Sequence, residues 1–274
     1  MRAKCEKIFL VWFFARLFVP LHLLMSMNKE VTTKVMFQRA ERLLGREAME
    51  RLGQQRVIIF GVGGVGSWCA ESLVRTGIRH LTMVDFDRVS PTNINRQLMA
   101  TTATVGQMKV EELRRRLLDI NPEADIRAVT TPFNEETADS FELGSYDYVI
   151  DAIDSLADKA RLILMTCETE GRLFSSMGAA LKCDPSRIRV AEFWKVEGDP
   201  LARALRRRFK HAGQFPQRKF QCVYSDELIP NRDEEAAADI AVERGNGSLV
   251  HITAIFGFTL GSLVIRDVMS AADR

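Results

Sequence analysis

Cysteine is scarce and unpaired in this chain: the 274 residues include five cysteines, and no two of them form a C-x-x-C pair. An odd, scattered set argues against a disulfide framework, and the missing pairs argue against a four-thiolate zinc site. We therefore expect a reducing, cytoplasmic compartment and no zinc.

An excess of charge of either sign is also missing. Lys and Arg total 38 against 36 acidic residues, a net charge of +2. A protein that coats nucleic acid without specificity is usually more basic, so only a local basic patch remains open. With 46% hydrophobic and 27% charged residues, the chain is neither wholly disordered nor a multi-span membrane protein, and it is long enough for one large α/β domain or two small ones.

Long, almost wholly apolar runs occur near the two ends of the chain. Residues 8–25 resemble a signal peptide or membrane anchor, but Arg16 and Pro20 interrupt the run and no small-x-small cleavage site follows. We therefore expect residues 1–26 to be an apolar extension from a mis-annotated start, with a real anchor as the alternative. Residues 252–265 would span about 21 Å as a helix, short of the ~30 Å hydrocarbon core, which favours a buried helix over a second anchor.

Between these ends, β-branched runs alternate with helical segments. We expect strands at 56–60, 81–85, 126–130, 146–151 and 173–177, with helices at 65–75, 106–118 and 157–170. This alternation predicts an α/β fold with a Rossmann-like, doubly wound, mainly parallel sheet and helices on both faces. After residue 198 the pattern changes to a basic helix, an acidic loop and the final apolar helix.

A glycine-rich loop follows the first of these strands. It reads G-x-G-x-x-G and contains Gly61, Gly63, Gly64 and Gly66. Such glycines let backbone N–H groups approach phosphates at a helix N-terminus. Asp85 lies 19 residues further on, at a strand end where a ribose acceptor belongs. These features predict an adenine-nucleotide site.

Amides and cations lie at the mouth of the same crevice: Asn93, Arg96, Gln97 and Lys109. Cations do not serve a nicotinamide ring, whereas they suit a triphosphate. Asp154 follows the fourth strand, where a carboxylate can hold Mg²⁺. Three of these residues also have an interpretation that needs no ligand. Lys109 is then a solvated helix lysine, Arg96 a loop cation and Asp154 a helix N-cap.

Six segments together resemble the ThiF/MoeB/ubiquitin-activating superfamily, whose members adenylate a carboxylate with ATP. They are Arg39-x-x-Arg42, the glycine loop, Val84-Asp-Phe-Asp87, Asn93-x-Asn-Arg-Gln97, Thr104-Val-Gly-Gln-x-Lys109 and Asp151-x-x-Asp154. The resemblance implies an ATP site within residues 36–180, with these ligands besides the glycines: Asp85, Asp87, Asn93, Arg96, Gln97 and Lys109. The implied catalytic set is Arg42, Arg96, Lys109 and Asp154. Asp154 is similar to the Mg²⁺ aspartate, and Arg42 to an arginine that enters the partner subunit's site in a homodimer.

Two departures from the superfamily's usual pattern narrow the resemblance to one branch. The paired C-x-x-C motifs of many carrier-protein activators are absent, and Asp154-Ser155 stands where the superfamily usually has Asp-Asn. Further segments resemble the TcdA branch, the tRNA threonylcarbamoyladenosine dehydratases: Gly64-Val-Gly-Ser-Trp68, Arg75-Thr-Gly-Ile78, Gln221-Cys-Val-Tyr-Ser225 and Ile255-Phe-Gly-Phe258. This resemblance implies that residues 27–274 form one ThiF-type adenylating domain, and we expect its part 181–274 to handle RNA.

Resemblance to this branch implies that a threonyl carboxylate attacks the α-phosphorus of ATP and that the ureido group captures the acyl-adenylate. No enzyme nucleophile is required because the ring-closing atom is tethered, so we expect Cys222 to be structural. The implied partners are tRNA, a second subunit and a sulfur-relay cysteine desulfurase. The main alternative is an activator of a ubiquitin-like or sulfur-carrier protein; a non-catalytic binding platform and an NAD oxidoreductase are less favoured.

Residues 203–219 contain an unbalanced group of cations and no acid: Arg203, Arg206, Arg207, Arg208, Lys210, Arg218 and Lys219. Phosphate contacts dominate nucleic-acid affinity and need such a patch, so we expect this segment to bind tRNA. The alternative is a solvated helix face. Phe209, Phe215 and Phe220 are interleaved and are candidates for base stacking, although core packing is more usual for phenylalanine.

Overall fold

The computed structural model describes residues 35–232 and 245–270. The chain divides into two compact units, residues 1–45 and 46–274. The first unit contains helix α3 (Gln38–Leu44), which ends where the Gly45 N–H donates to the Glu41 carbonyl. Arg42 is exposed on this helix. The expected boundary after residue 26 lies outside the described residues.

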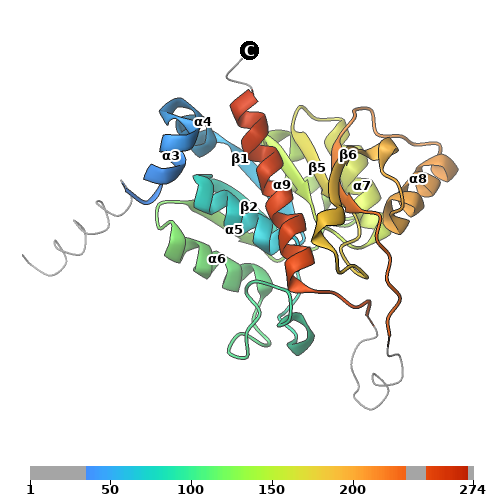
Figure 1. The fold of residues 1–274 in the computed structure, drawn as a ribbon. Helices are drawn as coiled ribbons and strands as arrows, with labels where there is room; N and C mark the ends of the chain where they lie inside the picture. Colours follow the sequence, from blue (N-terminus) through green and yellow to red (C-terminus); the bar gives the residue numbers. More distant parts are fainter. Residues whose placement is uncertain (1–34, 233–244, 271–274) are drawn as a thin grey trace, which may run out of the picture. The chain divides into compact units, whose positions relative to one another are not determined.

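The second unit is built on a seven-stranded sheet with the order β3-β2-β1-β4-β5-β7-β6 (Figure 1). Its strands are β1 (Arg56–Phe60), β2 (His80–Val84), β3 (Asp125–Val129), β4 (Tyr148–Asp151), β5 (Arg172–Ser176), β6 (Ile188–Glu192) and β7 (Gln221–Ser225). All neighbours are parallel except β6 and β7, which are antiparallel. The predicted α/β class and mainly parallel sheet are confirmed. The last two strands were not predicted.

Helices cover both faces of the sheet. They are α4 (Arg46–Gln54), α5 (Gly66–Thr76), α6 (Lys109–Ile120), α7 (Leu156–Cys167), α8 (Pro200–Ala212) and α9 (Val250–Ser270). Short 3-10 turns are η1 (Pro91–Asn93), η2 (Ala138–Phe141), η3 (Leu143–Ser145), η4 (Pro185–Arg187) and η5 (Phe193–Lys195). Helices α5, α6 and α9 lie in front of the sheet in Figure 1. A core cluster shared by the sheet, α7 and α8 fills the other face.

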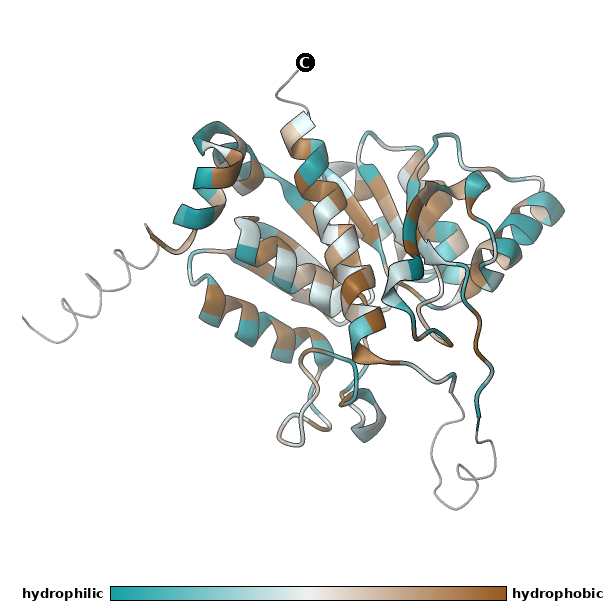
Figure 2. Ribbon diagram, in the orientation of Figure 1, coloured by the Kyte–Doolittle hydropathy of each residue, from teal (hydrophilic) through white to brown (hydrophobic). Residues whose placement is uncertain are grey.

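Helix α9 is longer than the sequence predicted. It contains 21 residues, about 31 Å, so the argument that it is too short for a membrane was wrong. Among the described helices it is the one that passes length and apolarity criteria for a span. Figure 2 shows apolar and neutral residues along most of it. Its packing nevertheless matches the expected buried helix, because 56% of its most apolar window is buried inside the protein.

Two glycines bring α9 against α5. A Cβ at Gly257 would overlap the Val65 carbonyl oxygen, and a Cβ at Gly261 would overlap the Ser72 Oγ. Further along, the Asp267 carboxylate accepts hydrogen bonds from Tyr148 (2.8 Å) and Arg172 (2.6 Å). These contacts make α9 an integral part of the second unit.

A charged cluster joins α5 to α6. Glu71 on α5 accepts hydrogen bonds from Arg116 on α6 (2.6 Å) and from Arg75 (2.8 Å), and its side chain is 8% exposed. Burial alone would raise the pKa of Glu71, but the two guanidinium groups outweigh burial and lower the pKa below its ordinary value.

Candidate active site

A cavity of about 820 Å³ lies at the carboxyl ends of β1, β2, β4 and β5. In open α/β sheets, ligands bind at this edge, where the chain leaves neighbouring strands in opposite directions. The structure brings these predicted residues to its lining: Gly61, Gly63, Gly64, Asp85, Asp87, Arg96, Gln97, Lys109 and Asp154.

The glycine loop has a shape that side chains would prevent. Gly61 has a φ of +84°, and a Cβ there would lie 2.6 Å from the Ala152 carbonyl oxygen. A Cβ at Gly66 would overlap the Gly61 carbonyl oxygen, so Gly66 packs the loop against α5 and does not line the cavity. No side chain caps α5, and its first turn contains no acid. Its N-terminus is therefore available to an anion.

Asp85 is fixed at the end of β2 by two backbone donors. Its Oδ2 accepts from the Val62 N–H (2.9 Å), and its Oδ1 from the Asp87 N–H (2.9 Å). Burial raises the pKa of Asp85, against the opposing effect of Lys109 and these amides. Each carboxylate oxygen retains acceptor capacity, which suits hydroxyl groups of a ribose.

The predicted cations are held by their neighbours. Lys109 is 6% exposed, and its Nζ lies 2.7 Å from Asp87 Oδ2. The Arg96 guanidinium donates to the Thr92 carbonyl (2.8 Å). The buried Oε1 of Gln97 has no hydrogen-bond partner among the described residues. The cavity thus combines two positive groups with an amide oxygen that has unused hydrogen-bonding capacity.

Asn93 does not line the cavity. Its Oδ1 accepts from the Ser90 N–H (3.0 Å), and its carbonyl accepts from the Arg96 and Gln97 N–H groups. Asn93 therefore shapes the turn that carries Arg96 and Gln97, and its direct contact with a triphosphate stays a prediction.

Asp154 and Asp158 form an acidic part of the rim. Asp154 is exposed and accepts no hydrogen bond from the described residues, whereas Asp158 accepts from Ser155 Oγ (2.7 Å). Mg²⁺ is commonly held by one or two carboxylates together with substrate phosphates and water, so this donor set fits it. The described residues contain no cluster of three or more Asp, Glu, His or Cys able to hold a metal by itself.

Asp151 has a separate, structural position. It is fully buried at the end of β4, where it pairs with the buried Lys159 (2.9 Å) and accepts from Ser175 Oγ (2.6 Å). This pair links β4 to α7 and β5, below the loop that carries Asp154. The sequence did not predict it.

The cavity is also lined by two buried charged residues that the sequence reasoning missed. Lys182 follows β5 and is 4% exposed; Asp199 precedes α8 and is 1% exposed. The pair Asp199-Pro200 is a recognisable helix start. Nothing in it indicates that the carboxylate lines the same cavity as the glycine loop, which lies more than 100 residues earlier in the chain.

The cysteines near the sheet are not placed for covalent chemistry. Cys222 on β7 is fully buried, and burial raises the pKa of its thiol well above the ordinary value. A buried neutral thiol is a poor nucleophile, which favours the expected structural role. Cys183 is an exposed free thiol.

The predicted RNA-binding cations separate into two groups. Arg203, Arg207 and Lys210 are exposed along one face of α8 and form no ion pair within the described residues. In contrast, Arg206 donates to the Phe193 carbonyl (3.0 Å). Arg218 donates to the Gly171 carbonyl (2.8 Å) and to two carbonyls at the C-terminal end of α7. The remaining predicted cations, Arg208 and Lys219, are also exposed.

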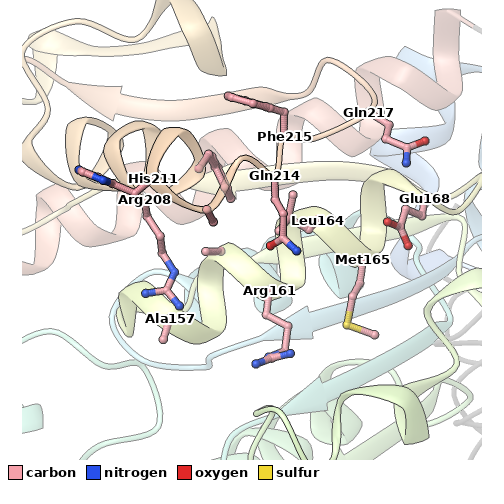
Figure 3. A pocket seen from close by; sticks show the side chains of 13 residues that line it. Ala157, Arg161, Leu164, Met165, Glu168, Arg208, His211, Gln214, Phe215 and Gln217 are labelled. Carbon is pink, nitrogen blue, oxygen red and sulfur yellow. The ribbon is translucent and has the colours of Figure 1, made fainter.

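The three phenylalanines of this segment differ in exposure. Phe209 and Phe220 are buried in the core, so they are not available for base stacking, while Phe215 is 51% exposed. Phe215 lines a second cavity of about 720 Å³ between α7 and α8. Figure 3 shows Arg208 on α8 and Arg161 on α7 lining the same groove.

The doubly wound sheet and the glycine-loop cavity define a nucleotide-binding α/β protein. The chain belongs to the ThiF family, which matches residues 37–268. It is 37% identical over 241 residues to the tRNA threonylcarbamoyladenosine dehydratase of Bacillus subtilis strain 168, covering 85% of this chain and 94% of that protein. It is 33% identical over 184 residues to the Escherichia coli K12 molybdopterin-synthase adenylyltransferase, covering 67% and 69%. The solved E. coli TcdA in complex with ATP has a TM-score of 0.77 at 34% identity, covering 87% of this chain and 95% of that one.

Proposed function

We propose that this chain is an ATP-dependent enzyme that dehydrates threonylcarbamoyl-adenosine beside the tRNA anticodon, closing it to a cyclic form through an acyl-adenylate. One observation carries the proposal: a single cavity contains the glycine loop, Asp85, two cations and the Asp154 carboxylate. This is the set of groups that carboxylate activation by ATP needs. The similarity to dehydratases over most of the chain supports this substrate.

The first step is the attack of the threonyl carboxylate on the α-phosphorus of ATP, with pyrophosphate leaving. Asp85 binds the ribose, while the glycine loop and the start of α5 receive the phosphates. Arg96 and Lys109 stabilise the negative charge that develops on the triphosphate. Asp154 would hold Mg²⁺, which would neutralise charge on the phosphates. Lys109 has to exchange or share its contact with Asp87 when the phosphates bind.

In the second step the enzyme has to position the substrate and does not have to supply a nucleophile. The ureido group of the substrate lies on the same molecule as the activated carboxyl, so ring closure is intramolecular. It expels AMP without a covalent bond between substrate and enzyme. The burial of Cys222 supports this path over a thioester.

The partners follow from the same proposal. Arg203, Arg207 and Lys210 on α8 bind tRNA phosphates, aided by Arg208, Lys219 and the groove beside Phe215. Arg42 enters the site of the second subunit in a homodimer located in the cytoplasm. The cysteine desulfurase partner stays a prediction, as does membrane attachment through residues 1–26.

A second candidate is the activation of a carrier protein with the same adenylation chemistry. The similarity to a molybdopterin-synthase adenylyltransferase supports this second candidate. It differs in the product: the adenylate forms on a protein C-terminus and no modified nucleoside loses water.

The test is to incubate the protein with ATP and tRNA that bears threonylcarbamoyl-adenosine, then digest the tRNA and weigh the nucleoside. Loss of one water with release of AMP and pyrophosphate is expected. Asp154→Ala should abolish pyrophosphate release in a folded protein, while Asp139→Ala, an exposed carboxylate outside the cavity, should not. An unchanged nucleoside, or normal release by Asp154→Ala, would contradict the function or the assignment, respectively.

A further inference from the structure

One part of the cavity has no role in the proposed adenylation step. It is lined by the end of β5 and the residues that follow it (176–182), by the start of α8 and by residues 245–248. Asp199 lies in its wall, almost fully buried. A charged group here is unexpected unless a ligand or another charge compensates it.

Only one oxygen of the Asp199 carboxylate is explained by the fold. Its Oδ1 accepts from the Ala202 N–H (2.8 Å) and so caps α8. Its Oδ2 is buried and has no hydrogen-bond partner among residues 35–232 and 245–270. A Cβ at Gly178, which also lines the cavity, would lie 3.5 Å from Oδ2. Because Oδ2 is itself buried, it becomes available to a substrate only when the chain around it shifts.

Its surroundings make Asp199 a stronger base than an exposed aspartate. Burial raises the pKa of Asp199, and the Ala202 amide and the charge of Lys182 oppose that rise. Lys182 donates to the Glu227 carbonyl (2.6 Å) rather than to Asp199. Its charge compensates the carboxylate without occupying Oδ2.

We propose that this chamber receives the ureido group of the substrate and that Asp199 Oδ2 accepts the N–H proton lost at ring closure. This inference rests on the proposed function. The ureido nitrogen forms a bond to the activated carboxyl carbon, the bond from that carbon to the AMP oxygen breaks, and AMP leaves with the electron pair. The ureido proton moves to Asp199, which later releases it to water. Asp199 thereby acts in the second step and not in the first.

Asp199→Asn separates this role from helix capping, because Asn caps a helix as well as Asp but is not a carboxylate base. The matched control is Asp184→Asn: Asp184 caps η4 through the Ser186 N–H, is exposed and lies outside the cavity. Three quantities are measured on the full chain: urea unfolding, exchange of labelled pyrophosphate into ATP in the presence of substrate tRNA, and formation of the cyclic nucleoside.

For Asp199→Asn we expect a wild-type urea midpoint, exchange within about threefold of wild type and cyclisation slower by about 100-fold or more. The acidic limb of the pH profile for cyclisation should disappear in this variant and persist in Asp184→Asn. Wild-type cyclisation by Asp199→Asn, or equal losses in exchange and cyclisation, would overturn the inference. Should Asn disturb the fold, Asp199→Ser keeps a cap and is read in the same way. A wild-type protein that forms no cyclic nucleoside would instead refute the proposed function.

Discussion

Substituting alanine for Gly257 tests whether α9 belongs to the adenylating domain. The new Cβ would overlap the Val65 carbonyl oxygen and lie 2.8 Å from the Cys69 nitrogen. Both are backbone atoms of the α5 region, so no side-chain rotation relieves the overlap, and α9 must move away. Because Val65 is part of the glycine loop and both Val65 and Thr253 on α9 line the cavity, that movement also disturbs the ATP site.

The magnitude follows from two opposing effects. Alanine is favoured over glycine in a helix interior by about 1 kcal/mol. Overpacking costs about 1–3 kcal/mol, and overlap with backbone belongs at the upper end. We expect Gly257→Ala to lower the free energy of unfolding by about 1–2 kcal/mol. At about 2–4 °C per kcal/mol for a domain of this size, Tm falls by roughly 2–8 °C.

Two further glycines provide the comparison. Gly261→Ala meets the Ser72 hydroxyl, which can rotate and give up its bond to the Cys69 carbonyl (2.9 Å), so its stability should stay near wild type. Gly53→Ala in α4 meets only ordinary contacts with Arg79 and Gly77, so it should gain about 0.5–1 kcal/mol. Urea unfolding and the KM for ATP are measured for all three. A Gly257→Ala protein as stable as wild type, with an unchanged KM, would refute the packing of α9 on α5.

The remaining predictions concern charge. Because the pKa of Glu71 is lowered in the folded protein, its contribution to stability is present above the unfolded pKa and is lost as pH falls through the folded pKa. Glu71→Gln should cost about 1–2 kcal/mol at pH 7 and progressively less as pH falls below the ordinary pKa of Glu, and a cost that does not change with pH would contradict this. Mixing inactive Arg42→Ala and Asp154→Ala subunits should restore activity; no recovery after subunit exchange would place Arg42 in its own subunit's site or exclude this dimer. Neutralising Arg203, Arg207 and Lys210 should weaken tRNA binding and reduce its salt slope by about two units, at roughly 0.7–0.9 per phosphate contact, without changing ATP affinity. Identical slopes would mean that the RNA binds elsewhere.

Strands β1 to β5 could be predicted, and their positions agree with the sequence to within two residues. Strands β1, β2, β4 and β5 are short apolar runs with turn signals, and β3 is a partly exposed edge strand. Strand β6 reads Ile-Arg-Val-Ala-Glu, a half-exposed edge strand with one apolar face, so its pattern does not differ from that of a loop. Strand β7 lies between β5 and β6 although helix α8 precedes it, which local sequence does not indicate.

The candidate site likewise contains residues whose position could be predicted from the sequence and residues whose position could not. The glycine loop and Asp85 could be predicted because the chemistry requires adjacent residues at fixed spacing. The position of Asp199 could not, since it depends on how α8 packs across the end of β5. Arg206 and Arg218 show the converse: both belong to a basic run, yet their guanidinium groups donate to nearby carbonyls. Composition identifies a charged segment, and only packing shows which of its charges are free for a ligand.

Cys222 offers a last prediction that separates tethered ring closure from thioester chemistry. Its thiol is buried on β7, and burial raises its pKa, so neither access nor ionisation favours attack on an adenylate. Cys222→Ala removes one buried sulfur atom and should cost about 1–2 kcal/mol of stability through lost packing, while cyclisation per folded molecule remains within about twofold of wild type. Cys183→Ala, at an exposed thiol, serves as the control and should change neither quantity. The comparison is made well below the unfolding temperature, with pyrophosphate exchange measured alongside the cyclic nucleoside. If Cys222→Ala keeps its fold and its exchange but no longer forms the cyclic product, the thiol takes part in the second step and the argument from burial is wrong.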